Sequence, residues 1–135
     1  MDCENYIDRA KKSLSEGSLP SFIENIAIAK YLNKDDSSKQ RDILTLYAKG
    51  LYKHNQFQGA LEIVEKVIPM LEGDEKYRLI NTQGILKGQL GDYNTATDIF
   101  RRVLAESGSP IIKLKATNNL AWSYIYLHST TSEKE

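Results

Sequence analysis

Apolar residues recur at three- and four-residue steps along most of the chain, and short polar segments separate these runs. Such steps place apolar side chains on one face of an α-helix. No segment shows the strict apolar–polar alternation of a half-buried strand. The pattern therefore predicts an all-α protein with helices at residues 3–16, 19–33, 38–53, 57–71, 75–89, 93–106 and 110–128.

Turn and capping residues mark the ends of these predicted helices. Gly17 suits the left-handed conformation that closes a helix, and Ser18 is then placed to cap the next one. Ser37 and the glutamine three residues later resemble a capping box. Asp74 and Asp92 precede the fifth and sixth helices, and we expect both to cap them.

Two stretches of the chain, residues 44–67 and 80–103, carry the same landmarks in the same order. Ala60 and Ala96 are 36 residues apart, and the aromatic and large apolar residues around them recur at this offset. A fixed period of this size is typical of a stacked repeat array. One helical hairpin cannot bury both of its faces, and stacking on the next hairpin buries the remainder.

These landmarks resemble the tetratricopeptide repeat, a helix-turn-helix unit of about 34 residues. On this resemblance, small residues allow the two helices of each unit to approach closely. Ala48 pairs with Ala60 in one unit, and Gly84 pairs with Ala96 in the next. A larger side chain at these positions is expected to overpack the contact.

The resemblance covers almost the whole chain. It implies a right-handed superhelical stack of antiparallel helix hairpins, with about seven helices in three repeat units and a final helix. Residues 1–128 then form a single domain, followed by a polar tail at 129–135. In the final helix, the resemblance assigns core positions to Leu120, Ala121 and Tyr124.

The resemblance also implies a concave groove lined by the first helix of each unit. As contacts to a peptide or protein partner it assigns Lys11, Thr45, Lys49, Tyr52, Lys53, Arg78, Asn81, Gln89, Lys115, Asn118 and Trp122. It places Ile85 and Gly88 on the same face. Basic residues predominate in this set, so we expect a basic groove. An Asn amide is both donor and acceptor and can pair with the backbone of an extended peptide. The alternative is that these are solvated polar residues on helix faces.

The final helix is apolar nearly all round, whereas a terminal repeat is expected to have a polar outer face. Trp122, Ile125 and Tyr126 are the predicted contacts at this end of the array. Two explanations stand side by side: the chain is a fragment of a longer array, or the helix binds another copy in a homodimer.

Composition narrows the classes of function. Hydrophobic residues at 41% and charged residues at 27% are typical of a globular protein. Eighteen basic and eighteen acidic residues give no net charge, which argues against direct nucleic-acid binding. No apolar run approaches the ~20 residues that cross a bilayer, and the first residues lack a signal-peptide pattern. The lone cysteine, Cys3, favours a reducing compartment, so we expect a soluble, cytoplasmic protein.

Residues suited to catalysis or metal binding are few and scattered. His54 and His128 are isolated in the sequence, and no Cys or His spacing suits a metal. The glycines do not form a phosphate-binding loop. We therefore expect no catalytic residues, no metal and no cofactor, and an enzyme is not predicted.

Three hypotheses for function remain. The first is a scaffold or adaptor that binds an extended peptide or partner protein in the groove. The second is the ligand-sensing part of a bacterial transcription regulator controlled by a signalling peptide, which needs a DNA-reading domain outside this sequence. The third is a structural oligomerisation unit.

Overall fold

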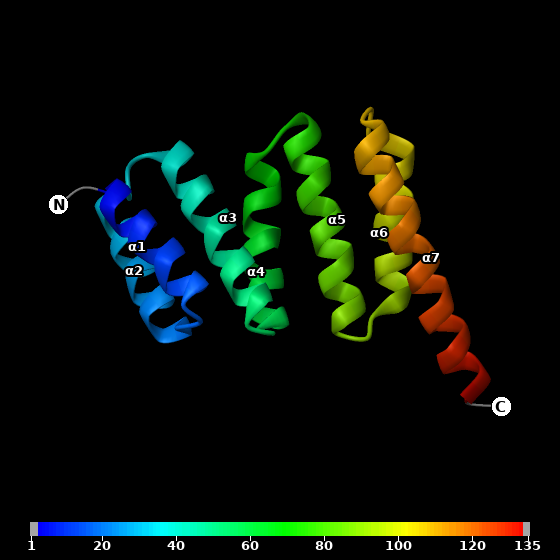
Figure 1. Ribbon diagram of the computed structural model, residues 1–135. Coiled ribbons are helices and arrows are strands. Elements are labelled where there is room, and N and C mark those ends of the chain that lie inside the picture. The colour runs from blue at the N-terminus through cyan, green and yellow to red at the C-terminus, as the bar shows by residue number, and fades with distance from the viewer. Residues whose placement is uncertain (1–2, 134–135) are drawn as a thin grey trace. The chain divides into compact units, whose positions relative to one another are not determined.

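The computed structural model describes residues 3–133, and this part of the chain is all-α, without a strand (Figure 1). Its elements are α1 (Cys3–Ser15), α2 (Leu19–Leu32), α3 (Ser37–Lys53), α4 (Phe57–Val67), the short 3₁₀ helix η1 (Ile68–Met70), α5 (Gly73–Gln89), α6 (Tyr93–Glu106) and α7 (Pro110–Glu133). The all-α prediction is confirmed, and most helix bounds lie within a few residues of those predicted.

The two largest differences in helix length fall on α4 and α7. Helix α4 stops at Val67, and the chain continues as η1, which contains Pro69. Proline has no backbone N–H to continue α-helical hydrogen bonding, so the last turn tightens. Helix α7 continues to Glu133, past the end predicted at residue 128.

Two of the predicted helix ends form as their local chemistry dictates. Gly17 has a φ of +77°, the left-handed conformation expected after a helix. Asp92 accepts a hydrogen bond from the backbone N–H of Thr95, with a distance of 3.2 Å, and so caps α6.

The predicted capping box at Ser37 is wrong. Ser37 is already helical, and the preceding Asp36 accepts the capping hydrogen bond from the first turn of α3. The Gln40 amide instead reaches the end of α2, where Nε2 donates to the carbonyls of Lys30 and Asn33 at 2.8 and 2.7 Å. Gln40 therefore joins two helices, since its amide adds to the backbone hydrogen bonds that these carbonyls accept from Asn33 and Asp36 at the helix end.

Two further capping predictions are also wrong. Ser18 occupies the N-cap position of α2, but its side chain makes no capping hydrogen bond. Asp74 lies inside the first turn of α5, because this helix begins at Gly73. An acidic residue in a first turn still interacts favourably with the helix dipole.

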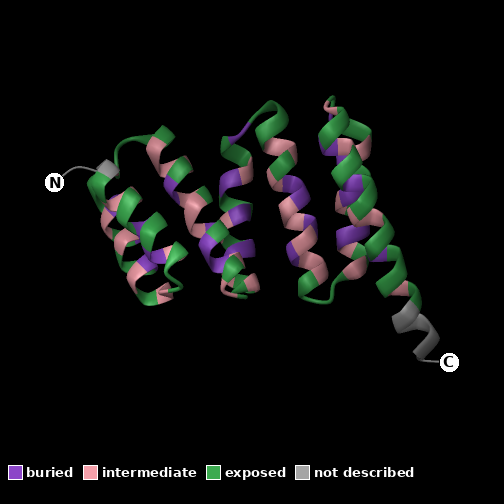
Figure 2. Cartoon of the chain, viewed as in Figure 1, coloured by how far each residue is buried: buried purple, intermediate pink, exposed green. Residues whose placement is uncertain are grey.

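Residue contacts divide the chain into two compact units, where the sequence pattern predicts one domain. The first unit comprises residues 1–63 and the second comprises residues 64–135. Each has its own buried residues (Figure 2). The two units are described separately below.

In the first unit, α1 packs on α2 and α2 packs on α3. The buried core includes Ala10, Phe22, Ile26, Ala29 and Ile43. The Phe22 ring lies directly on the backbone of α3 at Gly50, where a Cβ would collide with the ring. Glycine is therefore required at this position for the α2–α3 contact.

In the second unit, α5 packs on α6, and α7 packs on both. The buried core includes Ile80, Val103, Ile112 and Ala116. A Cβ on Gly84 would lie 2.5 Å from the Phe100 ring. The sequence pairs Gly84 with Ala96, and both are buried, but the atoms that lie closest to Gly84 belong to Phe100.

The predicted core face of the final helix is wrong. Within residues 110–128, the buried residues are Ile112, Ala116 and Ser123. Of the predicted core residues, Leu120 is half-buried, and Ala121 and Tyr124 are exposed. The repeat pattern directs those two residues toward a following helix. Helix α7 packs instead on α5 and α6, which turns the opposite face inward.

We predict opposite effects on stability from alanine at the two glycines inside α5. Gly84→Ala places a methyl group against the Phe100 ring, and overpacking of this kind costs ~1–3 kcal/mol. At Gly88, a Cβ would come no closer than 4.0 Å to Tyr93. Gly88→Ala should therefore stabilise the protein by about 0.5–1 kcal/mol, the usual gain of alanine over glycine within a helix.

Urea unfolding followed by circular dichroism measures both changes in free energy. The two substitutions are chemically identical and lie one turn apart on one helix, so helix propensity alone predicts the same gain for both. Equal stabilisation by both variants would show that the Phe100 ring does not rest on the Gly84 backbone.

We also predict that Asp92 stabilises the fold in a pH-dependent way. The hydrogen bonds from Thr95 hold the pKa of this carboxyl below its ordinary value of 3.8. Its stabilisation is therefore fully present above that value and is lost as the pH falls through the lower, folded-state pKa. Asp92→Ala should melt at a lower temperature than the parent at pH 7, and the gap should close toward pH 2. A gap that is unchanged at low pH would contradict the cap.

Candidate functional site

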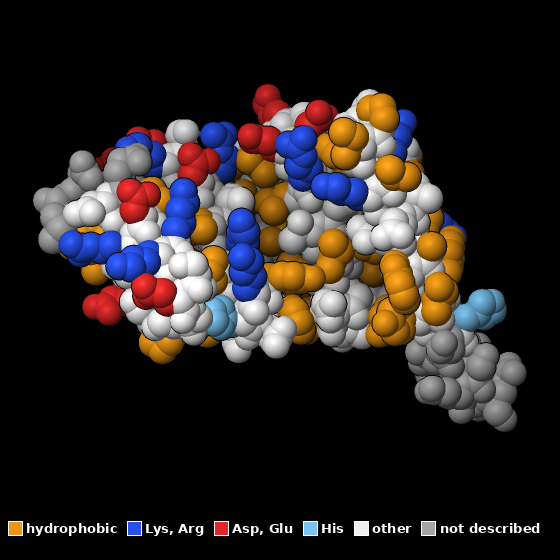
Figure 3. Space-filling view, viewed as in Figure 1, with side chains coloured by type: hydrophobic (Ala, Val, Ile, Leu, Met, Phe, Trp, Pro, Cys, Tyr) orange, Lys and Arg blue, Asp and Glu red, His pale blue; other side chains and the backbone are white. Residues whose placement is uncertain are grey.

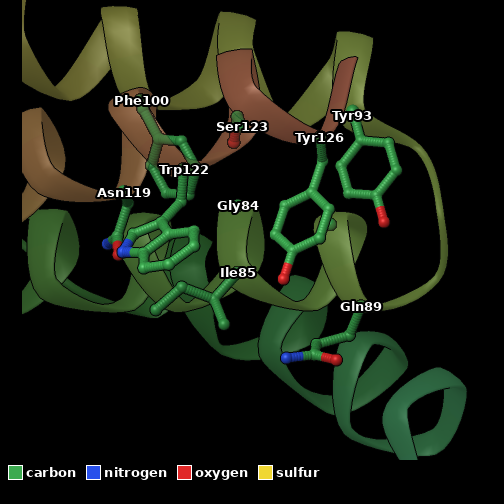
Figure 4. Close-up of a pocket in the computed structure, with 10 residues that line it drawn as sticks. Gly84, Ile85, Gln89, Tyr93, Phe100, Asn119, Trp122, Ser123 and Tyr126 are labelled. Atoms are coloured by element: carbon green, nitrogen blue, oxygen red, sulfur yellow. The ribbon is translucent and has the colours of Figure 1, made fainter. Parts of the chain in front are cut away.

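The second unit contains a pocket between α5 and α7, with α6 behind it (Figure 4). Its volume is about 380 Å³. It is lined by Gly84, Ile85, Gly88, Gln89, Tyr93, Phe100, Asn119, Trp122, Ser123 and Tyr126. All of these residues belong to one compact unit, so α5, α6 and α7 alone define the pocket.

Two glycines of α5 open the space that the pocket occupies. The hydrogen at Gly84 lets the Phe100 ring reach the helix backbone and close the pocket from behind. Gly88, one turn further along α5, has only Tyr93 within 4.0 Å of where its Cβ would be. A side chain at Gly88 would therefore project into open space, and its absence keeps this part of the pocket free.

Three aromatic side chains form a continuous wall of the pocket. Tyr93 stacks on Tyr126, with ring centroids 5.3 Å apart and an interplanar angle of 9°. Trp122 lies beside Tyr126, with centroids 6.0 Å apart and an angle of 29°. Trp122 and Tyr126 remain 54% and 49% exposed, so roughly half of each side chain is accessible. Aromatic surfaces of this kind are enriched in protein interfaces.

The polar groups of the pocket are uncharged. Gln89 lies at one end and Asn119 lies beside Trp122 (Figure 4), while Ser123 is buried in the wall formed by α7. Each amide offers both donors and an acceptor. No carboxylate, ammonium, guanidinium or imidazole group is among the lining side chains. The pocket thus suits a neutral, largely apolar group with hydrogen-bonding atoms at its edges.

The structure brings part of the predicted groove set together in this pocket. Gln89 and Trp122 line it, as do Ile85 and Gly88 from the same predicted face. Tyr126, predicted as an array-end contact, is also part of the aromatic wall. The groove residues among them were assigned by the resemblance to the tetratricopeptide repeat, and Tyr126 by the apolar character of the final helix.

Five lining residues were not recognised as site residues from the sequence: Gly84, Tyr93, Phe100, Asn119 and Ser123. Tyr93, Phe100 and Gly84 matched the repeat pattern as packing residues, and their second role depends on the way α5, α6 and α7 meet. Asn119 carried no distinguishing signal beyond its position next to Asn118.

The interpretation of Asn81 as an accessible peptide contact is wrong. Only 5% of this residue is exposed, and its Nδ2 donates to the carbonyl of Ile112 in α7 at 3.3 Å. Its Oδ1 is buried without a hydrogen-bond partner. Asn81 therefore lies at the α5–α7 contact, because α7 packs across the face that the repeat pattern assigns to the groove.

The remaining predicted residues of the second unit lie outside the pocket. Arg78, Lys115 and Asn118 are exposed. Ile125 is 55% exposed and belongs to the outer face of α7.

In the first unit, four of the predicted contacts, Lys11, Thr45, Lys49 and Lys53, are exposed. The Thr45 hydroxyl donates to the carbonyl of Arg41 at 2.8 Å, one turn earlier in α3. Tyr52 is partly buried, and its ring meets the edge of Phe57 with centroids 5.7 Å apart. Much of Tyr52 is thus used in packing α3 against the start of α4.

Residues suited to other chemistry are dispersed. Among the residues that the structure describes, no three His, Cys, Asp or Glu side chains come together in a way that could hold a metal. The side chain of Cys3 lies outside the described part. None of the described helices combines the length and apolar character needed to cross a membrane.

No protein family model, curated protein or solved structure matches the chain. The shape and chemistry of the pocket are therefore the basis on which its function can be argued.

Proposed function

We propose that this protein is a non-enzymatic binding module that holds an extended segment of another protein. The segment inserts a large apolar side chain into the pocket between α5 and α7. One observation carries this proposal: three aromatic rings and the side-chain amides of Gln89 and Asn119 surround a cavity. The cavity stays open because Gly88 has no side chain to fill it. The proposal includes a cytoplasmic location and a tetratricopeptide-like stacking of the hairpins, both inferred from sequence.

The size and lining of the pocket support an apolar anchor. A volume of about 380 Å³ lies at the lower end of the range for ligand sites. That volume holds one large side chain and its adjoining backbone. The rings of Trp122 and Tyr126 contact the anchor, and burying such a side chain contributes about 1.5–3 kcal/mol.

The two amides suit the backbone on either side of the anchor. Gln89 and Asn119 come from different helices, so they can pair with peptide groups that flank the inserted side chain. The lining offers no carboxylate, imidazole or thiol to act as acid, base or nucleophile, which supports binding over catalysis.

Two exposed cations add a preference for an acidic residue near the anchor. Arg78 precedes Ile85 by two turns on α5, and Lys115 precedes Trp122 by two turns on α7. Seven residues of helix correspond to about 10 Å. An extended peptide covers that distance in about three residues. The proposed ligand therefore carries an acidic residue about three positions from its apolar anchor.

We predict that filling the pocket abolishes binding and leaves the fold intact. Synthetic peptides with a single Leu or Phe anchor, with Asp three positions before or after it, are titrated against the protein. Fluorescence of Trp122, the single tryptophan, reports binding. Gly88→Leu should weaken binding by more than about tenfold, which corresponds to 1.4 kcal/mol, because its side chain occupies the space of the anchor.

Gly88→Ala is the matched control, since it adds only a methyl group at the same position. It should retain most of the affinity, and both variants should unfold no more readily than the parent. If peptides with and without an apolar anchor bind equally, or if Gly88→Leu binds like Gly88→Ala, the pocket is not the binding site.

A further inference from the structure

The outer face of α7 carries an apolar stripe that the described residues of the second unit leave uncovered. Ile111, Leu114 and Ile125 are 67%, 70% and 55% exposed. They lie opposite the face that packs on α5 and α6, which is formed by Ile112 and Ala116. Hydrophobic side chains gather along the α7 side of the second unit (Figure 3). Exposed apolar surface of this extent marks an interaction site.

The spacing of this stripe is that of a coiled-coil seam. Ile111, Leu114, Asn118, Ala121 and Ile125 follow one another at steps of three, four, three and four residues, and all five are exposed. This alternation keeps side chains facing a partner helix along its length. The α7 stripe therefore fits another α-helix better than it fits a flat surface or an extended strand.

Asn118 indicates what kind of helix covers the stripe. It is the one polar residue of these five and lies at the centre of the stripe. Covering it with an apolar helix would leave its amide without a partner, which costs about 1–3 kcal/mol. An asparagine in the same layer of an identical helix removes that cost, because each amide both donates and accepts. A single central asparagine is also the residue that sets register in parallel two-stranded coiled coils.

We propose that the outer face of α7 binds the same face of a second copy of this chain, as a parallel pair. Asn118 then meets Asn118 of the second copy, with Leu114 and Ala121 in the layers on either side. This is an isologous contact, in which one surface completes itself across a twofold axis. None of the five stripe residues lines the pocket, although Trp122, which follows Ala121 on α7, does.

Charge and bulk at the edges of the seam permit this pairing. Within α7, Lys115 is the one charged residue at the positions that flank the stripe between Ile111 and Ile125 in a parallel pair. Arg101 of α6 is held over the ring of Tyr124, at another flanking position. The residue opposite Lys115 across a parallel seam is Pro110 of the second copy, so like charges do not face each other. Helices α5 and α6 lie behind α7, on the side away from the seam, and do not obstruct the second helix.

Sedimentation velocity over a range of protein concentrations tests the pairing. The parent protein should form dimers, and Leu114→Glu should sediment as a monomer, because it places two carboxylates in one layer. Tyr31→Glu is the matched control, since Tyr31 is 69% exposed on α2 in the first unit. It should dimerise like the parent, and circular dichroism should show equal helix content in all three proteins.

Two outcomes overturn the proposal: a parent that stays monomeric at the highest concentration, or two glutamate variants that associate equally. A monomeric parent is also the result expected if a different protein, and not a second copy, binds this face.

Disulfide trapping tests the parallel register. In a Cys3→Ser background, Asn118→Cys should oxidise to a covalent dimer, since the two residues face each other across the axis. Glu24→Cys, at an exposed position of α2, should remain monomeric under the same conditions. Failure of Asn118→Cys to cross-link in a preparation that sediments as a dimer rules out the parallel arrangement.

Discussion

Each unit of this protein depends on a phenylalanine ring that lies directly on a helix backbone. Phe22 rests on Gly50 in the first unit, and Phe100 rests on Gly84 in the second. Both rings are almost fully buried, and both contacts exist only because glycine has no Cβ. This close approach fixes the separation of the helices that meet there. In the second unit, the pocket between α5 and α7 follows from that separation.

The pocket is a consequence of how Phe100 packs. Its ring fills the space over Gly84 but does not extend to Gly88. The next turn of α5 therefore faces α7 across an open volume. Gly88 leaves that volume empty, and the rings of Tyr93, Tyr126 and Trp122 line it. Two glycines one turn apart thus have opposite roles: one permits a contact and the other preserves a space.

Helix α7 presents three different faces, set by the direction in which its side chains project. Small and aliphatic residues such as Ala116 pack on α5 and α6. Trp122 and Tyr126 flank that face and form the pocket wall. Leu114 and Ile125 project outward, where we propose that a second copy binds. One helix therefore carries residues of both the proposed peptide site and the proposed dimer contact.

The sequence by itself determined the helices and several of their ends, because hydrophobic periodicity and capping act between residues a few positions apart. Gly17 and Asp92 formed as predicted for this reason. The tertiary structure alone decided which faces are covered. The repeat pattern assigned Trp122, Gln89 and Gly88 to inner helix faces, and the structure brings them to one pocket. It also placed Asn81 on an open groove, where α7 buries it. The exposure of a side chain depends on which helix packs over it, and that neighbour is distant in the sequence.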